Sequence, residues 1–478
     1  MKKHLYLFVF CVILVSNGFS QVLYELRIEQ GENYPSCVFN TDDDDTLVGL
    51  FFRNEPCKLI KINKEGMIVD SLLFDAEDYG SVWICNIIKA EQHGHYLALR
   101  EKLYQSKCFI VVCEFDNDFN VLWEKTIDSI QEGSVFDMGG QFLNGYYYIY
   151  TSLFSGDKAY FYKINTEGEL FHSAAYQNCF FSPRFMTHIP NTDSFIINTE
   201  AEDFYLDVIN TDLEIDTGFW YNGNVVGSPN LEFINDSIFV TSGMGTEGPW
   251  GNYQDRLVIK ATNFNETLGN PYASVKMTIF GEEGIGGSPW YPGCRTGDRR
   301  ALAMHDNYFF FAGTGLFNNS MGPFYDTTDN FVMVYAFDHN LDSLWAIHLG
   351  YDAYYLTWSI APTIDGGCVV IAYYYDWRGS GTMESYIVRI AKDFEVSIPE
   401  TEKPNPFATV FPNPGNNRFL IQTELANFTL QLYDMQGQLR LTQQNRKEVN
   451  TEKLPSGCYI YRIIAENGKA TNGKWVKK

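Results

Sequence analysis

The residue types that most often carry catalysis occur in this sequence without the spacing that catalysis needs. Of the eight histidines, the seven that follow residue 20 lie in no H-E-x-x-H motif, and no G-x-S-x-G segment supports a nucleophilic serine. His93 and His95 flank a predicted tight turn, where turn or surface roles are favoured over metal binding. Glu282, Glu283, Asp298 and Arg299 could supply an acidic pair with a charged partner, but carboxylates are abundant and solvation is the simpler interpretation. No catalytic residue is predicted, and enzyme activity is not favoured.

Metal and thiol chemistry have little support in the sequence. The run Asp42–Asp45 has the composition of calcium ligands without the spacing of a known calcium loop, so an exposed turn is predicted. No metal site or cofactor is predicted, and calcium is left open. There is no C-x-x-C spacing, and Cys85 and Cys368 lie in apolar runs typical of buried strands. One disulfide, between Cys37 and Cys57, is also left open.

Aromatic side chains in long, glycine-rich segments are the best candidates for a binding site. The segments cover residues 242–254, 269–299, 314–330 and 374–385. Exposed aromatic faces stack on sugar rings or anchor a protein partner. The alternative is that these rings pack the segments onto the domain beneath them. The predicted ligand-binding residues are Trp250, Trp290, Tyr291, Tyr325 and Trp377.

Seven repeats with a period near 50 residues must position these segments. One marker is a strand that ends in a polar turn, as in KLIKINKEG from Lys58, YFYKINTEG from Tyr160 and YIVRIAKDF from Tyr386. A second marker precedes each of these, a tight polar turn followed by an apolar strand, as in LNGYYYIYT and IDGGCVVIA. Each repeat therefore holds about four short strands, and repeats of this length are typical of a β-propeller.

The predicted fold is all-β. A seven-bladed β-propeller covers residues 21–398, a linker covers 399–408, and a small Ig-like β-sandwich covers 409–478. The strand-like run Val22–Ile28 is expected to pair with the seventh repeat, which would remove an open sheet edge. An eight-bladed ring and two smaller propellers are the alternatives. The first and third turns of each repeat should lie on one face and the long segments on the other, where function usually lies.

The first twenty residues predict export. Lys2 and Lys3 precede the apolar stretch Leu5–Val15, and small residues before Gln21 fit a signal peptide cleaved at that point. The apolar stretch is shorter than the roughly 20 residues that cross a bilayer. No later segment is long and apolar enough to be a transmembrane helix.

Motifs near the C-terminus carry the strongest resemblance in the chain. They read VFPNPGNNRFLIQ, LQLYDMQGQLR, LPSGCYIYRII and GKATNGKWVKK, in this order, up to the last residue. This stretch resembles the type A C-terminal sorting domain of the Bacteroidetes type IX secretion system. The resemblance implies recognition by the type IX machinery in the outer membrane, removal of the domain and attachment of the cargo to surface lipopolysaccharide. The matching positions are Pro412, Asn413, Pro414, Tyr433, Asp434, Gly437, Leu454, Gly457, Tyr459, Gly468, Lys469, Gly473, Lys474, Val476, Lys477 and Lys478.

The net charge of the chain indicates which classes of binding partner to expect. The chain has a net charge of -24, and from residue 404 onward ten Lys or Arg outnumber five Asp or Glu. Once Lys2 and Lys3 are removed, the repeats carry roughly -31, so nucleic acid is not an expected partner, because its phosphates require a basic surface. We therefore expect a secreted or cell-surface module that binds a glycan or a protein. The alternative is a secreted hydrolase or lyase that acts on polysaccharide or peptide at the long-segment face.

Overall fold

A computed structural model divides the chain into two compact units, Met1–Phe394 (unit 1) and Glu395–Lys478 (unit 2). The predicted signal peptide lies outside the described residues. The structure describes residues 22–29, 31–52, 56–74, 81–90, 92–105, 107–131, 135–153, 158–177, 185–200, 205–220, 225–226, 231–247, 252–267, 275–280, 293–296, 300–317, 329–379, 381–392, 408–423, 425–434, 439–465 and 470–478.

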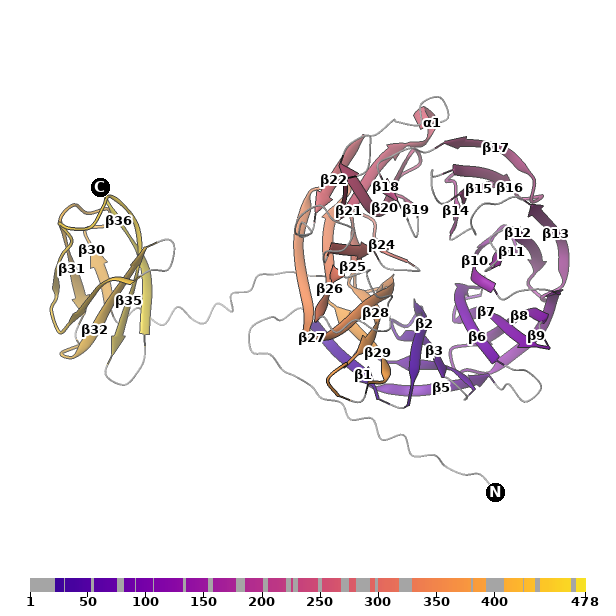
Figure 1. The fold of residues 1–478 in the computed structure, drawn as a ribbon, viewed down its shortest axis with the longest axis horizontal. Coiled ribbons are helices and arrows are strands. Elements are labelled where there is room, and N and C mark those ends of the chain that lie inside the picture. Colours follow the sequence, from indigo (N-terminus) through magenta and orange to yellow (C-terminus); the bar gives the residue numbers. More distant parts are fainter. Residues whose placement is uncertain are drawn as a thin grey trace, which may run out of the picture. The chain divides into compact units, whose positions relative to one another are not determined.

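Unit 1 consists of antiparallel sheets, and each of the first five is built from strands that follow one another in the chain (Figure 1). Sheet 1 contains β2 (Asn33–Asn40), β3 (Thr46–Phe52), β4 (Cys57–Ile62) and β5 (Ile68–Phe74). Sheet 2 contains β6 (Ser81–Lys89), β7 (His95–Tyr104), β8 (Lys107–Asp116) and β9 (Val121–Ile130). Sheet 3 contains β10 (Val135–Leu143), β11 (Tyr146–Leu153), β12 (Lys158–Asn165) and β13 (Leu170–Gln177). Sheet 4 contains β14 (Met186–His188), β15 (Ser194–Glu200), β16 (Tyr205–Asn210) and β17 (Ile215–Trp220).

The second half of unit 1 continues this order with longer hairpins. Sheet 5 contains β18 (Val225–Val226), β19 (Leu231–Phe233), β20 (Ile238–Glu247), β21 (Asn252–Asn263) and β22 (Lys276–Phe280). A short helix, α1 (Phe264–Thr267), follows β21. The remaining strands are β23 (Gly293–Thr296), β24 (Leu302–Met304), β25 (Tyr308–Phe317), β26 (Asn330–Asp338), β27 (Ser343–Pro362), β28 (Cys368–Tyr375), β29 (Met383–Ile390) and β1 (Val22–Ile28).

The long strand β27 belongs to two sheets. Its first half pairs with β26 and its second half, from Tyr354, pairs with β28. Gly350 and Tyr351 have φ angles of 109° and 77° at the junction, a left-handed conformation that bends the chain between the two halves. As the sequence predicts, β1 pairs with β29, so both ends of unit 1 contribute to one sheet.

The sheets follow one another around a common centre (Figure 1). Strands β2, β6, β10 and β14 lie on the inner side, and β5, β9, β13 and β17 lie on the outer side. The core fills the space between neighbouring sheets. Val112 of sheet 2 and Ile149 of sheet 3 share one buried cluster, and Phe161 of sheet 3 shares another with Ile197 of sheet 4.

Two of the predicted long segments contain more strand than expected. Residues 242–247 and 252–254 extend the β20–β21 hairpin, and β22 and β23 both lie within 269–299. These strands are rich in glycine and polar residues, so their sequences lack the apolar pattern that predicts a strand. Their pairing depends on partners across the sheet, such as Met244 opposite Leu257.

The polar turns that mark the repeats share one structure. In four sheets the side chain of the first turn residue accepts hydrogen bonds from backbone N–H groups two and four residues later. This Asx geometry stabilises a tight turn through local hydrogen bonds, so the polar turn at the end of the strand can be recognised from the sequence. The four residues are Asp116, Asn165, Asn210 and Asp338.

Basic residues near the end of the third strand connect neighbouring sheets. Lys61 Nζ donates to the carbonyl of Asn117 in sheet 2, and Lys163 Nζ donates to that of Thr211 in sheet 4, both at 2.9 Å. Arg389 occupies the equivalent position on β29 and reaches sheet 1. These contacts hold successive sheets in register.

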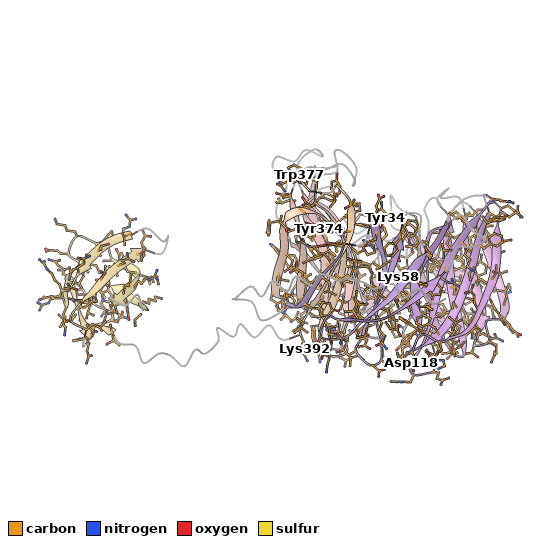
Figure 2. The ribbon with its side chains drawn as sticks, turned by 90° about the horizontal axis from the view of Figure 1, so that it is seen from below. Tyr34, Lys58, Asp118, Tyr374, Trp377 and Lys392 are labelled. Atoms are coloured by element: carbon orange, nitrogen blue, oxygen red, sulfur yellow. The ribbon has the colours of Figure 1, made fainter. Side chains whose placement is uncertain are left out.

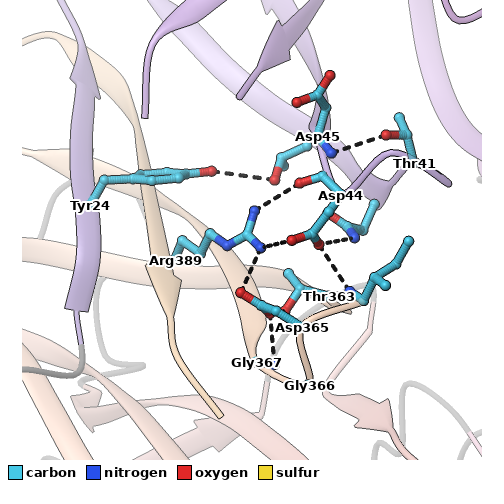
Figure 3. A network of polar contacts seen from close by, with 12 residues as sticks. Tyr24, Thr41, Asp44, Asp45, Thr363, Asp365, Gly366, Gly367 and Arg389 are labelled. Carbon is cyan, nitrogen blue, oxygen red and sulfur yellow. Dashed lines mark hydrogen bonds and ion pairs between the residues drawn. The ribbon is translucent and has the colours of Figure 1, made fainter. Parts of the chain in front are cut away.

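Arg389 and the Asp42–Asp45 turn form a clasp between β29 and sheet 1 (Figure 3). The fully buried guanidinium pairs with Asp44 and with Asp365, at 2.9 Å for Asp365, and also donates to the carbonyl of Asp44. Asp42 pairs with Lys89 of sheet 2, and Asp45 pairs with Lys61. The prediction of an exposed turn is therefore wrong, because the side chains of Asp42, Asp44 and Asp45 are only 11%, 18% and 21% exposed.

The clasp makes stability sensitive to acid. Burial alone would raise the pKa of Asp365, but hydrogen bonds from Thr363 and Gly367 and the charge of Arg389 outweigh it and lower this pKa. A lowered folded pKa stabilises the protein above the unfolded value, about 3.9 for Asp, and this stability is lost as the pH falls below it. We expect the thermal midpoint to hold between pH 7 and 5 and to fall below about pH 4. Scanning calorimetry of wild type and Asp365→Asn checks this, and an equal fall in both would contradict it.

Cys37 and Cys57 do not form a disulfide. Both are free thiols, and β3 lies between their strands, so two strand spacings separate them by roughly 10 Å, beyond disulfide reach. Burial raises the pKa of Cys57 to about 12. Cys85 and Cys368 are buried free thiols, which confirms the prediction that they pack as small apolar residues.

Unit 2 is a small two-sheet domain. One sheet contains β30 (Ala408–Phe411), β31 (Arg418–Thr423) and β34 (Glu448–Asn450). The other contains β33 (Leu439–Gln444), β32 (Phe428–Asp434), β35 (Gly457–Ala465) and β36 (Ala470–Lys477). Apolar residues alternate along β31 and β32 and meet in one core around Trp475.

Candidate functional site

Trp377 is the one predicted ligand-binding residue within the described part of the chain. It lies in the connection between β28 and β29, and Figure 2 shows it at the end of unit 1 opposite Lys392 and Asp118. Its Nε1 donates to Asp329 at 3.2 Å, and the guanidinium of Arg378 lies 3.9 Å from its ring centre. Arg378 also pairs with Asp329, and its hydrogen bonds lower the pKa of Asp329. One face of the indole is thus covered by a fixed cation. Trp250, Trp290, Tyr291 and Tyr325 lie outside the described residues.

A second polar network lies close to Trp377. Arg27 on β1 donates to the hydroxyl of Tyr374 at 3.0 Å and to that of Tyr355 at 3.2 Å, and it pairs with Asp352 at 3.0 Å. Burial would raise the pKa of Asp352, but the hydrogen bonds from Tyr355 and Arg27 lower it. Arg378 donates to the carbonyl of Asp352, so the two networks are joined. Two arginines and their carboxylate and tyrosine partners therefore form one connected network at this end of unit 1.

Five aromatic rings form a continuous row across sheets 1 and 2 and the β27–β29 region. Successive ring centres are 4.6 Å, 6.1 Å, 5.8 Å and 4.9 Å apart. All but Tyr373 are only half-buried. The row is Trp83, Phe51, Tyr34, Tyr373 and Trp358. We call this set the aromatic row.

A cavity of about 440 Å³ is lined by the inner strands of several sheets. Its walls combine mostly apolar residues of β2 and β6 with polar side chains from sheets 2 and 3 and from the β23–β27 region. We call it the central cavity. Its polar lining includes Asn86, Asp137, Gln141, Arg300 and Ser359.

A β-bulge precedes the central cavity in four inner strands. Bulges redirect side chains and are common next to functional sites. The residue that follows each bulge lines the cavity, and three of the four residues are polar. The register shifts lie between Pro35 and Cys37, Ile84 and Asn86, Val135 and Asp137, and Thr357 and Ser359.

Sequence reasoning missed both the aromatic row and the central cavity. Most of their residues lie in the inner strands β2, β6 and β10 and in the second half of β27, whereas the predicted site residues lie in the long connections. One signal was present. Tyr34, Trp83 and Trp358 each stand shortly before a Ser or Cys in an inner strand, and aligning the repeats on that strand would have brought them together.

Among the described residues, no group of three or more His, Cys, Asp or Glu side chains is placed to hold a metal ion. His95 Nδ1 lies 2.9 Å from Glu114 within sheet 2, and His93 is exposed in the adjoining turn. No helix in the described part of the chain is long and apolar enough to cross a membrane.

In unit 2, the matching sorting residues lie on paired segments. Asn413 accepts from the backbone N–H of Val476, and the Trp475 indole donates to the carbonyl of Pro412. Lys477 is buried, and its ammonium donates to the carbonyls of Thr451, Glu452 and Leu454. The other positions are Pro414 beside Asn413, Tyr433 and Asp434 on β32, Gly457 and Tyr459 on β35, Gly473 and the exposed Lys474 on β36, and the terminal Lys478, which is also exposed. Gly437, Gly468 and Lys469 lie outside the described residues.

Comparison with known proteins identifies unit 2. Residues 409–478 match the family described as a secretion system C-terminal sorting domain. This confirms the resemblance noted in the sequence: the chain is a cargo of the type IX secretion system and is delivered to the cell surface or beyond it. No curated protein sequence matches the chain.

Several solved structures are similar to the chain at low identity. Hydrazine synthase of Kuenenia stuttgartiensis is 11% identical with a TM-score of 0.44, covering 77% of this chain and 98% of that one. Extracellular domains of two hybrid two-component systems of B. thetaiotaomicron are 10% and 11% identical, with TM-scores of 0.43 and 0.40. Each covers 94% of this chain, which spans 58% and 55% of their lengths.

Proposed function

We propose that unit 1 is a seven-bladed β-propeller that acts as an extracellular binding module for a glycan or a protein. Seven sequence repeats, four consecutive four-stranded sheets around a common centre and the β1–β29 pairing support this fold. The observation that carries the function is the aromatic row, whose half-buried rings lie beside the central cavity. Aromatic anchors of this kind dominate binding energies.

Residues 21–478 should bind a member of an array of glycans and extracellular-matrix proteins. Changing Trp83 and Trp358 to Ala together is expected to weaken that binding by tenfold or more, since truncating an aromatic anchor typically costs about 2 kcal/mol. Trp377→Ala tests the predicted loop residue in the same assay. The array is run with and without calcium, because calcium is left open by the sequence.

The matched control is Phe171→Ala, which removes an exposed ring from outer strand β13, 64% exposed and outside the aromatic row. Unchanged affinity in the Trp83 and Trp358 variant, with its thermal midpoint preserved, would rule out the aromatic row as the site. Turnover on a polysaccharide or peptide panel would instead support the hydrolase or lyase alternative.

A further inference from the structure

We propose that the central cavity binds a short neutral saccharide, with the aromatic row as the platform on which the chain enters. The proposal rests on the proposed binding function and adds the site and the ligand class. The cavity volume of about 440 Å³ is in the range of small-molecule sites, roughly 300 to 1,000 Å³.

The aromatic row and the central cavity are continuous along three strands. On β2 the cavity lining begins two residues after Tyr34, and on β6 it begins two residues after Trp83. On β27 the lining residue Ser359 directly follows Trp358. A ligand that stacks on these rings therefore meets polar groups at the next step along the same strands. Sugars need this combination, because they present apolar C–H faces and hydroxyl edges.

Two side-chain amides supply hydrogen-bond donors. Asn86 Oδ1 accepts from the N–H of Ile87, and Gln141 Oε1 accepts from the N–H of His188, which fixes the orientation of both amides. The amide nitrogens of Asn86 and Gln141 have no protein partner among the described residues. Asp137 adds a carboxylate acceptor to the same lining. The cavity thus offers donors and an acceptor to hydroxyl groups.

The charges of the lining favour a neutral ligand. Lys89 pairs with Asp42, and Arg300 pairs with Glu232 at 2.7 Å, so each lining cation already has a carboxylate. Besides these two cations the lining contains an acid, Asp137, and the repeats as a whole carry a strong negative charge. A uronate or phosphate ligand would meet repulsion without a spare cation to offset it.

The test is titration calorimetry of residues 21–478 with neutral glucan, xylan, mannan and galactan oligosaccharides of two to six units, beside oligogalacturonate. We expect a neutral oligosaccharide to bind, and Asn86→Ala with Gln141→Ala to weaken it about tenfold through two lost hydrogen bonds. Asn86→Asp keeps the shape of the side chain and removes its hydrogen-bond donor. It therefore tests the lost donor in a variant that is expected to keep the wild-type fold. Gln92→Ala, an exposed amide next to sheet 2, is the matched control and should bind as wild type.

The outcomes separate the two proposals. Loss of binding in Trp83→Ala, with Asn86 and Gln141 variants unaffected, would overturn the cavity site and keep the binding function. A protein ligand with no saccharide, or tighter binding of oligogalacturonate, would overturn the ligand class alone. Binding of no probe of either class would overturn both.

Discussion

Replacing Arg389 with Met should lower the free energy of unfolding by about 3 kcal/mol, because the change leaves charged partners in a partly buried site. Arg389 is fully buried, and it holds Asp44 from sheet 1 and Asp365 from the turn before β28 together (Figure 3). Removing the cation leaves two carboxylates facing each other and a carbonyl of Asp44 without its donor. Chemical unfolding of residues 21–478, followed by tryptophan fluorescence, measures the loss.

The matched control for Arg389→Met is Arg378→Met. Arg378 pairs with one aspartate, but its side chain is 48% exposed, so solvent screens the pair and its loss should change the free energy of unfolding little. A double-mutant cycle adds Asp44→Asn, and the combined loss should be smaller than the sum, because both changes remove one interaction. A loss below 1 kcal/mol for Arg389→Met would show that the clasp does not hold unit 1 together.

Deleting residues 409–478 should abolish delivery of the protein to the cell surface and medium, since these residues form the sorting domain. Immunoblots of cell fractions should show the truncated chain retained inside the outer membrane. Equal surface delivery of the full and truncated chains would contradict the assignment.

Substitutions of the lysines at the end of unit 2 should distinguish residues needed for folding from residues needed for recognition by the secretion machinery. Lys477 is buried against three carbonyls, so Lys477→Met should destabilise unit 2 by about 1 to 3 kcal/mol, the cost of unsatisfied buried groups. Lys474 and Lys478 are exposed, so changing both to Glu should leave the fold intact. We expect that variant to fail in export while its unfolding midpoint stays at the wild-type value.

Local patterns account for what could be predicted from the sequence. The turn residues Asp116, Asn165 and Asn210 stabilise their own turns through hydrogen bonds that span two to four residues, so Asn or Asp recurs at this position in most of the markers. The sorting domain is likewise readable from motifs that occur in a fixed order. These short-range signals do not depend on the rest of the fold.

Contacts between distant residues account for what could not be predicted. Asp44 and Arg389 are 345 residues apart, and the composition of the Asp42–Asp45 turn suggested solvent exposure or calcium binding. The central cavity depends on bulges in four different strands, whose positions follow from pairing partners and not from the strand's own sequence. Of the five predicted ligand-binding residues, Trp377 alone lies in the described part of the chain, where Arg378 covers one face of its ring.

The pairing of β1 with β29 determines when unit 1 can finish folding during synthesis and export. A nascent chain cannot complete this sheet until nearly all of unit 1 has emerged, so the slow step of folding should come last. Until then β1 has no partner strand in its own chain and can pair with β29 of another copy. Before unit 1 has closed, two copies can therefore exchange these strands, and strand-swapped dimers are the by-product that the export pathway would have to suppress.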